Sequence, residues 1–175
     1  MEPLPIIVRA LAFAADKHRD QRRKDREASP YINHPIQLMS VLCNEVGITD
    51  REVLCGAILH DTVEDTQTTV DELVQHFGQT IARIVDEVTD DQNLSRPERK
   101  QKQIDHAATI SEGAKLVKLA DKICNLRDLN VAPPDGWDTE RKREYYDWAK
   151  AVVDQLRGTH ARLEALFDAS YAKRP

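Results

Sequence analysis

A histidine and an aspartate, His60 and Asp61, directly follow an apolar run, and two more carboxylates, Glu64 and Asp65, come soon after them. The apolar run, Val53–Leu59, contains no charged residue, so we expect a buried helix that delivers the pair at its end. Imidazole nitrogens and carboxylate oxygens are ligands of divalent metals. So dense a set of ligands in a short segment favours a metal-dependent hydrolase.

Two ligands must come from elsewhere, because consecutive residues of a helix point about 100° apart. His34 precedes Pro35, a stiff position at which a helix is expected to begin. Asp121 lies among apolar residues at helical spacing, where a lone carboxylate is costly to bury and an ion would remove that cost. Two imidazoles and two carboxylates, with water completing an octahedron, suit Mn²⁺ better than the tetrahedral preference of structural Zn²⁺.

The elements that position these residues are all predicted to be helices. Apolar residues recur at intervals of three and four, and no segment shows the alternation of a strand. The helices are expected to begin near Pro5, Pro35, Thr49 or Asp50, Thr69, Thr80, Pro97, Ser111 and Thr139, the last of which caps a long final helix. The predicted fold class is all-α, a multi-helix bundle with a central metal site.

Length and composition set further limits. The 175 residues fit one domain, which we expect to span 1–175, with its core at about 6–157 and a C-terminal helix or tail at 158–175. Three cysteines without a C-x-x-C pair favour neither a disulfide framework nor a zinc–thiolate site. No basic leader and no run of about 18 apolar residues is present, so we expect a cytoplasmic protein without a membrane partner.

Basic residues are clustered, although the net charge is −5. One cluster occupies residues 17–26, a second surrounds Arg96 and Lys100, and a third includes Lys118 and Lys122. On an acidic chain, such clusters beside a metal site indicate a small phosphorylated substrate and not a nucleic acid. For any single lysine, a solvated helix face is the simpler interpretation. The oligomeric state is left open by the sequence.

The four ligands follow one another in the order H…HD…D, a pattern that resembles the HD superfamily of metal-dependent phosphohydrolases. Longer segments resemble the hydrolase domain of RelA/SpoT-type alarmone enzymes: Gln21–Asp25, Pro30–Ile36, Leu59–Thr66, Glu87–Asp91, Glu98–Lys100, Val117–Lys122 and Asp135–Trp137. The resemblance runs from about residue 10 to 156. It is strongest to the stand-alone, Mesh-like small alarmone hydrolases, and so implies an HD-domain bundle.

The activity that this resemblance implies is Mn²⁺-dependent removal of the 3′-pyrophosphate of guanosine 3′,5′-bis(diphosphate), the stringent-response alarmone ppGpp, or of its pentaphosphate. Metal-activated water would be the nucleophile. Two alternatives stay open: a phosphatase of another purine nucleotide, including the 2′-phosphate of NADPH, and a catalytically inactive nucleotide sensor. The presence of Glu64 and Asp65 argues against the sensor.

The resemblance also implies residue roles. His34, His60, Asp61 and Asp121 match the metal ligands, and Glu64 with Asp65 matches the acidic pair that positions and deprotonates the water. The expected substrate contacts are Arg23 and Lys24 near the guanine and the metal, Asn125 at the sugar, and Arg96, Lys100, Arg141 and Tyr145 at phosphate or base. One departure is Asp128, which stands where multidomain members often have a small hydroxyl residue and which bears on sugar recognition.

Overall fold

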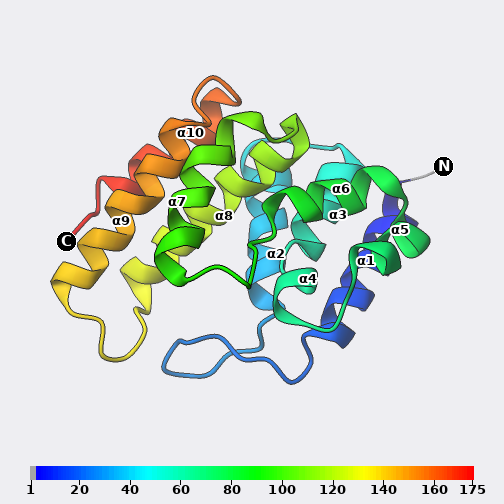
Figure 1. The fold of residues 1–175 in the computed structure, drawn as a ribbon, viewed down its shortest axis with the longest axis horizontal. Helices are drawn as coiled ribbons and strands as arrows, with labels where there is room; N and C mark the ends of the chain where they lie inside the picture. The colour runs from blue at the N-terminus through cyan, green and yellow to red at the C-terminus, as the bar shows by residue number, and fades with distance from the viewer. Residues whose placement is uncertain (1–2) are drawn as a thin grey trace.

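In the computed structural model, which describes residues 3–175, five helices pack against the long helix α8, while α1 packs on α3 and α5 on α6 (Figure 1). No strand occurs in this range, and one isolated bridge joins Arg22 to Pro30. The all-α prediction is confirmed. The elements are α1 Pro3–Lys17, α2 Asn33–Ser40, a π-helical turn Val41–Glu45, α3 Arg51–Leu59, α4 Thr62–Asp65, α5 Val70–Phe77, α6 Gln79–Val88, α7 Arg96–His106, a 3₁₀ turn Ala107–Thr109, α8 Glu112–Val131, α9 Thr139–Asp154 and α10 Ala161–Tyr171.

Two buried helices, α3 and α8, carry the site. In α3, all of Val53–Leu59 is buried, so the helix is enclosed on every side, as its uniformly apolar run predicted. The side chain of Asp50 caps this helix by accepting the backbone N–H of Glu52 at 2.8 Å. Helix α8 packs against α2, α3, α6, α9 and α10. Residues at the end of α3 and on the inner face of α8 therefore meet inside the bundle.

Close approach between α3 and α6 depends on Gly56. A Cβ atom built on this residue would lie 2.6 Å from Cγ2 of Ile84. Ile84 is a buried, β-branched residue of α6, so its Cγ2 has little freedom to move aside. The contact therefore excludes every side chain at position 56 unless the two helices separate.

Gly56→Ala should lower the free energy of unfolding by about 1 to 3 kcal/mol, because overpacking forces a backbone shift between α3 and α6. Urea unfolding followed by circular dichroism measures the effect. In an Ile84→Ala background the same substitution should cost much less, since the clashing methyl group is gone. Equal costs in both backgrounds would show that the contact with Ile84 is not the cause.

Three features differ from the expectations. Helix α2 begins at Asn33, before Pro35, and continues into the π-helical turn Val41–Glu45, two residues before Gly47, whose φ is +78°. Asp138, not Thr139, caps α9, since its side chain accepts the N–H of Arg141 at 2.8 Å. Helix α9 is also not the last, because α10 follows it.

Helix α10 extends the core beyond residue 157. Leu163 and Phe167 have no exposed surface and belong to the same apolar cluster as the inner residues of α8. Arg157 and Asp168 form an ion pair of 2.6 Å that fastens α10 to the turn before it. The expected core of about 6–157 was therefore too short, because a single apolar stripe of 11 residues is a weak signal in a sequence.

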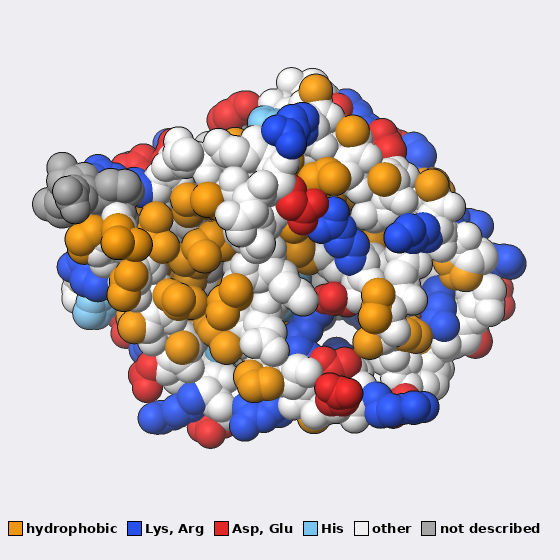
Figure 2. All heavy atoms as spheres, turned by 180° about the vertical axis from the view of Figure 1, so that it is seen from behind, with side chains coloured by type: hydrophobic (Ala, Val, Ile, Leu, Met, Phe, Trp, Pro, Cys, Tyr) orange, Lys and Arg blue, Asp and Glu red, His pale blue; other side chains and the backbone are white. Residues whose placement is uncertain are grey.

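The surface has an apolar side and a hollowed side. Figure 2 shows hydrophobic side chains gathered near the N-terminus, where α1 lies, and Leu4 and Val8 of α1 are 65% and 54% exposed. Away from that patch the molecule is hollowed, with basic and acidic side chains at the rim (Figure 2). None of the helices in residues 3–175 combines the length and the apolar character needed to cross a membrane.

Candidate active site

Four donor groups from three segments of the chain meet in the middle of the bundle. His60 Nε2 lies 2.9 Å from Asp61 Oδ2, and His34 Nε2 lies 3.2 Å from Asp121 Oδ1. The crossed distances, from His34 Nε2 to Asp61 Oδ2 and from His60 Nε2 to Asp121 Oδ1, are both 4.0 Å. His34 belongs to the first turn of α2, His60 and Asp61 join α3 to α4, and Asp121 lies on α8. The four side chains selected from the sequence as metal ligands therefore surround one point.

The histidine geometry indicates what that point can hold. His60 is 5% exposed, and its Nδ1 donates to the carbonyl oxygen of Ala57 at 2.8 Å. Its Nε2 then faces the donor centre and makes no hydrogen bond, although Asp61 Oδ2 lies near it. Fixing one ring nitrogen on a backbone carbonyl is the usual way to aim the other at a metal. The ligand atoms of His34, His60 and Asp121 lie within 4.8 Å of one another, so these residues fit a divalent metal.

Electrostatics at the donor centre favour a cation. Burial lowers the pKa of His60, but Asp61 and Asp121 outweigh it and raise that pKa to about 9. Burial also opposes the charged form of Asp121, yet Lys122, whose Nζ lies 3.1 Å from Asp121 Oδ2, holds the pKa of this carboxyl well below its usual range. Burial likewise opposes the charged form of Asp61, but His60 and His34 hold the pKa of its carboxyl well below its usual range. Both carboxylates are therefore ionised, and they draw positive charge to the centre.

Neighbouring side chains orient the two carboxylates. The hydroxyl of Tyr31 donates to Asp61 Oδ2 at 2.5 Å, and the amide of Asn125 donates to Asp121 Oδ1 at 2.6 Å. Burial, helped by the charge of Asp61, raises the pKa of Tyr31 well above its usual value, so the hydroxyl keeps its proton and stays a donor. Tyr31 was not selected from the sequence, although it lies only three residues before His34.

Glu64 lies in the same cavity as the donors. This cavity, here the donor cavity, has a volume of about 150 Å³ and is lined by Glu64 together with all four donor residues. Glu64 Oε2 accepts the backbone N–H of Asp90 at 2.9 Å. Burial raises the pKa of Glu64 to about 7, and the charges of Asp90, Asp61 and Asp65 act in the same direction. Its carboxyl group can therefore take up and release a proton near neutral pH.

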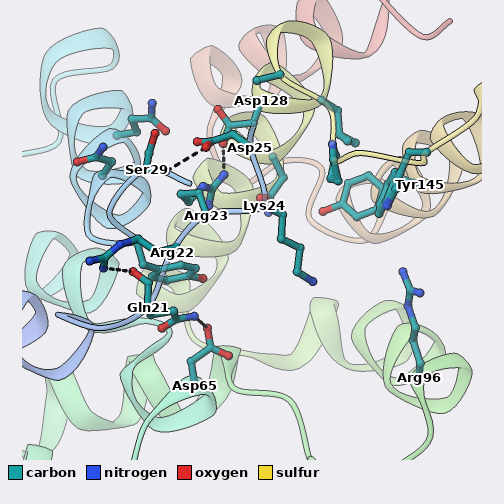
Figure 3. Close-up of a pocket in the computed structure, with 18 residues that line it drawn as sticks. Gln21, Arg22, Arg23, Lys24, Asp25, Ser29, Asp65, Arg96, Asp128 and Tyr145 are labelled. Atoms are coloured by element: carbon teal, nitrogen blue, oxygen red, sulfur yellow. Dashed lines mark hydrogen bonds and ion pairs between the residues drawn. The ribbon is translucent and has the colours of Figure 1, made fainter. Parts of the chain in front are cut away.

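Asp65 faces a second and larger space. The wide cavity, of about 490 Å³, lies beside the donor cavity and is lined by Asp65 but not by Glu64. The amide of Gln21 donates to Asp65 Oδ2 at 2.8 Å, which Figure 3 shows at the lower edge of this cavity. Behind it, Nδ1 of the buried His18 lies 2.6 Å from Gln21 Oε1, which must be the acceptor because the amide N–H groups serve Asp65. The two acids therefore face different parts of one site.

The basic loop after α1 forms one wall of the wide cavity. In Figure 3 Lys24 reaches into the cavity, while Arg96 approaches from α7 and Tyr145 from α9. Arg23 turns to Asp128, with which it forms an ion pair, so this carboxylate fixes the direction of a predicted substrate contact. The residues shared by both cavities are Arg23, Tyr31 and Asn125.

The remaining predicted contacts lie farther from the donors. Lys100 and Arg141 line a side hollow of about 430 Å³, which shares Arg96, Trp137 and Tyr145 with the wide cavity. The guanidinium of Arg141 lies 4.4 Å from the ring centre of Trp137, a cation–π distance. The structure thus brings Arg23, Lys24, Asn125, Arg96 and Tyr145 to the wide cavity and leaves Lys100 and Arg141 beyond it.

Gln103, Gln21 and His18 were not among the expected site residues, and Lys118 was named only as a member of a basic cluster. All four contribute to the walls of the site or to the support behind them. One signal was available on α8. Lys118, Asp121, Lys122 and Asn125 are spaced by three and four residues, which places them on one helix face. If Asp121 is a metal ligand, the other residues on its helix face are therefore candidates for the walls of the same site.

Comparisons with known proteins agree with this geometry. Residues 10–147 match the family model described as HD domain. The chain is 55% identical over 163 residues to guanosine-3′,5′-bis(diphosphate) 3′-pyrophosphohydrolase MESH1 of Xenopus tropicalis, covering 93% of this chain and 91% of that protein. It is 56% identical over 158 residues to the protein of the same name from Homo sapiens, covering 90% of this chain and 88% of that one.

A solved structure is similar throughout. It is described as "A metazoan ortholog of SpoT hydrolyzes ppGpp and plays a role in starvation responses", and it matches with a TM-score of 0.93 at 49% identity, over 97% of this chain and 95% of that one. The fold agrees with that of this structure, and the chain covers nearly the full length of these relatives.

Proposed function

Because this chain belongs to the HD domain family, and within it to the stand-alone Mesh-like alarmone hydrolases, we propose that it removes the 3′-pyrophosphate of guanosine 3′,5′-bis(diphosphate). The substrate is a small nucleotide, and the reaction is hydrolytic. The products are guanosine 5′-diphosphate and diphosphate. We place the reaction in the cytoplasm.

The observation that carries this proposal is the joining of two unlike cavities. The donor cavity holds the carboxylates, the imidazoles and Glu64, whereas the wide cavity is lined by Arg23, Lys24 and Arg96. A nucleotide with a phosphorylated ribose needs both environments, one for the group that is cleaved and one for the base and the second phosphate group. Arg23, Tyr31 and Asn125 line both, so a bound ribose would lie between them.

His34, His60 and Asp121, whose ligand atoms lie close together, would hold the ion with Asp61, whose Oδ2 lies near both histidines. We propose that the ion is Mn²⁺, since two imidazoles and two carboxylates leave positions for oxygen ligands in an octahedral arrangement. A bound divalent cation lowers the pKa of water toward neutrality and offsets phosphate charge. Comparing activity and binding after reconstitution with Mn²⁺, Mg²⁺ and Zn²⁺ tests the choice of metal.

Glu64 accepts the proton of the attacking water in this proposal. Its carboxyl group faces the donor cavity and has a pKa of about 7, so it can accept that proton at neutral pH. The oxygen of water forms a bond to phosphorus, the bond from phosphorus to the ribose 3′ oxygen breaks, and the 3′ oxygen takes up the proton that Glu64 accepted, which returns Glu64 to its ionised form. Asp65, held by Gln21, orients the water and the ribose from the side of the wide cavity.

The residues of the wide cavity hold the rest of the nucleotide. Lys24 supplies an exposed ammonium, and Arg23, oriented by Asp128, presents a flat guanidinium toward the space shared by both cavities. Asn125 uses its amide on Asp121, which leaves its carbonyl oxygen to accept a hydrogen bond from the sugar. Tyr145 offers a hydroxyl whose pKa burial raises to about 12, so it binds as a neutral donor.

The substrate preference can be measured directly. The Mn²⁺-loaded protein should hydrolyse guanosine 3′,5′-bis(diphosphate) with a kcat/KM at least about 10²-fold above that for GTP, because GTP places no phosphate on the ribose 2′ or 3′ oxygen. NADPH, with its 2′-phosphate, belongs in the same assay, because it is the alternative substrate that also carries a ribose phosphate. A clear preference for GTP would contradict the proposed function, and a clear preference for NADPH would replace it.

A further inference from the structure

Lys118 is a buried lysine at the wall of the donor cavity. It lies on α8, one turn before Asp121, and only 7% of it is exposed. It lines the donor cavity together with Glu64 and the metal-ligand candidates. A buried ammonium is costly unless an anion lies against it. The position therefore calls for a partner.

The surrounding carboxylates do not supply that partner directly. Within residues 3–175, Lys118 makes no hydrogen bond and no ion pair within 4.0 Å. Asp90 accepts both of its side-chain hydrogen bonds from the amide of Gln103, at 2.9 and 2.8 Å, and Glu64 accepts from the backbone of Asp90. These groups act on Lys118 only at longer range.

Lys122 provides the contrast on the same helix face. Its Nζ donates to Asp121 Oδ2 at 3.1 Å and lies 4.3 Å from the ring centre of Trp148, so its charge is already paired. Burial, with the charge of Lys122, lowers the pKa of Lys118 to about 8. The ammonium form still predominates at neutral pH, and its charge remains uncompensated by direct contact.

We propose that Lys118 binds the non-bridging oxygens of the ribose 3′-pyrophosphate and keeps its hold on the diphosphate product. This inference rests on the proposed function, which places the cleaved group in the donor cavity. The nucleoside and its 5′-diphosphate occupy the wide cavity, whose lining does not include Lys118. Lys118 also lines a hollow of about 400 Å³ on the side of Asp90. Of the two cavities assigned to the nucleotide it lines only the donor cavity, so within the bound nucleotide its contact is with the group that leaves.

Comparing how Lys118 variants bind each of the two products distinguishes a phosphate contact from a general structural role. Titration calorimetry of the Mn²⁺-loaded protein measures the affinity for inorganic diphosphate and, separately, for guanosine 5′-diphosphate. The first product tests the donor cavity and the second tests the wide cavity. Lys118→Met should weaken the binding of inorganic diphosphate about 10- to 100-fold, because it removes a charge-assisted contact while keeping an unbranched side chain that lacks only the charged end group. Its affinity for guanosine 5′-diphosphate should change by less than about 2-fold.

Two variants serve as controls. Lys115→Met makes the same change three residues earlier on α8, outside the lining of the donor cavity, and should leave both affinities unchanged. Lys118→Arg retains the charge and should restore part of the lost affinity. Circular dichroism and manganese content establish that each variant is folded and loaded.

Unchanged binding of inorganic diphosphate by Lys118→Met would overturn the proposal. So would an equal loss of affinity for both products, because that result indicates a structural role. The test does not depend on turnover: if the unmodified protein fails to hydrolyse the alarmone yet binds inorganic diphosphate through Lys118, the proposed function fails and the phosphate contact stands.

Discussion

After reconstitution with Mn²⁺, the Asp61→Asn protein should fail to retain the metal and should lack hydrolase activity, while its helices remain. Asp61 Oδ2 lies 2.9 Å from His60 Nε2 and 4.0 Å from His34 Nε2, so the charge that is removed stands at the donor centre. Manganese content should fall below about one-tenth of an ion per chain, since metal affinity depends on the deprotonated ligand. Elemental analysis of the purified protein measures this content.

The fold should survive this substitution. Asparagine keeps an oxygen that can accept the hydrogen bond from Tyr31, and position 61 lies in the turn between α3 and α4 and not within the apolar clusters. Asp71→Asn, an exposed change in the first turn of α5, is the matched control and should keep both metal and activity. A folded Asp61→Asn protein with its full manganese content would contradict the ligand assignment.

The Glu64→Gln protein should keep its metal and lose turnover by roughly 10²-fold or more, because a base is removed while the four donors stay in place. Glutamine retains the oxygen that accepts from Asp90, so the local structure is preserved. Measuring kcat, KM and manganese content on the same preparation separates this effect from that of Asp61→Asn.

The pH dependence gives a second readout on Glu64. Burial raises the pKa of its carboxyl group to about 7, and only the ionised form accepts a proton, so kcat should fall as the pH drops through this pKa. A cation in the donor cavity favours the ionised form and moves the midpoint to lower pH. The acidic limb should be absent from the residual activity of Glu64→Gln. Near-normal turnover in this variant would assign the base to another group, with Asp65 the first to test.

The donor centre followed closely from the sequence. His60 and Asp61 at the end of a wholly apolar run could only be delivered by a buried helix, and α3 is such a helix. Pro35 limited the conformation of His34, and the cost of burying Asp121 alone implied partners for it. These arguments work because each rests on a local constraint that holds whatever the tertiary packing.

The residues that support the donor centre could not be predicted from the sequence, because their roles depend on packing between segments that are distant in the chain. Lys118 and Lys122 had the sequence signature of solvated lysines, yet α8 is enclosed by five helices and both side chains are buried. Helical spacing shows which residues share a face, but it does not show which neighbour that face meets. The same limit applies to Gln21 and Asp65, which are hydrogen-bonded across 44 residues of sequence.

The ion pair between Arg23 and Asp128 illustrates a further limit. The sequence marked Asp128 as a departure that bears on sugar recognition, but the two residues are 105 positions apart. Only the fold shows that Asp128 orients Arg23. Similarly, the final helix α10 contributes Leu163 and Phe167 to the core. Its weak amphipathic pattern does not predict these contacts.

Hydrolysis of guanosine 3′,5′-bis(diphosphate) in water labelled with oxygen-18 tests the central claim most directly. After a single turnover, the products can be separated by chromatography, and the oxygen-18 content of each can be measured by mass spectrometry. The account predicts unlabelled guanosine 5′-diphosphate and one labelled oxygen in diphosphate, because water attacks the phosphorus bonded to the ribose 3′ oxygen. Release of labelled orthophosphate, with a 3′-monophosphate left on the nucleotide, would contradict it.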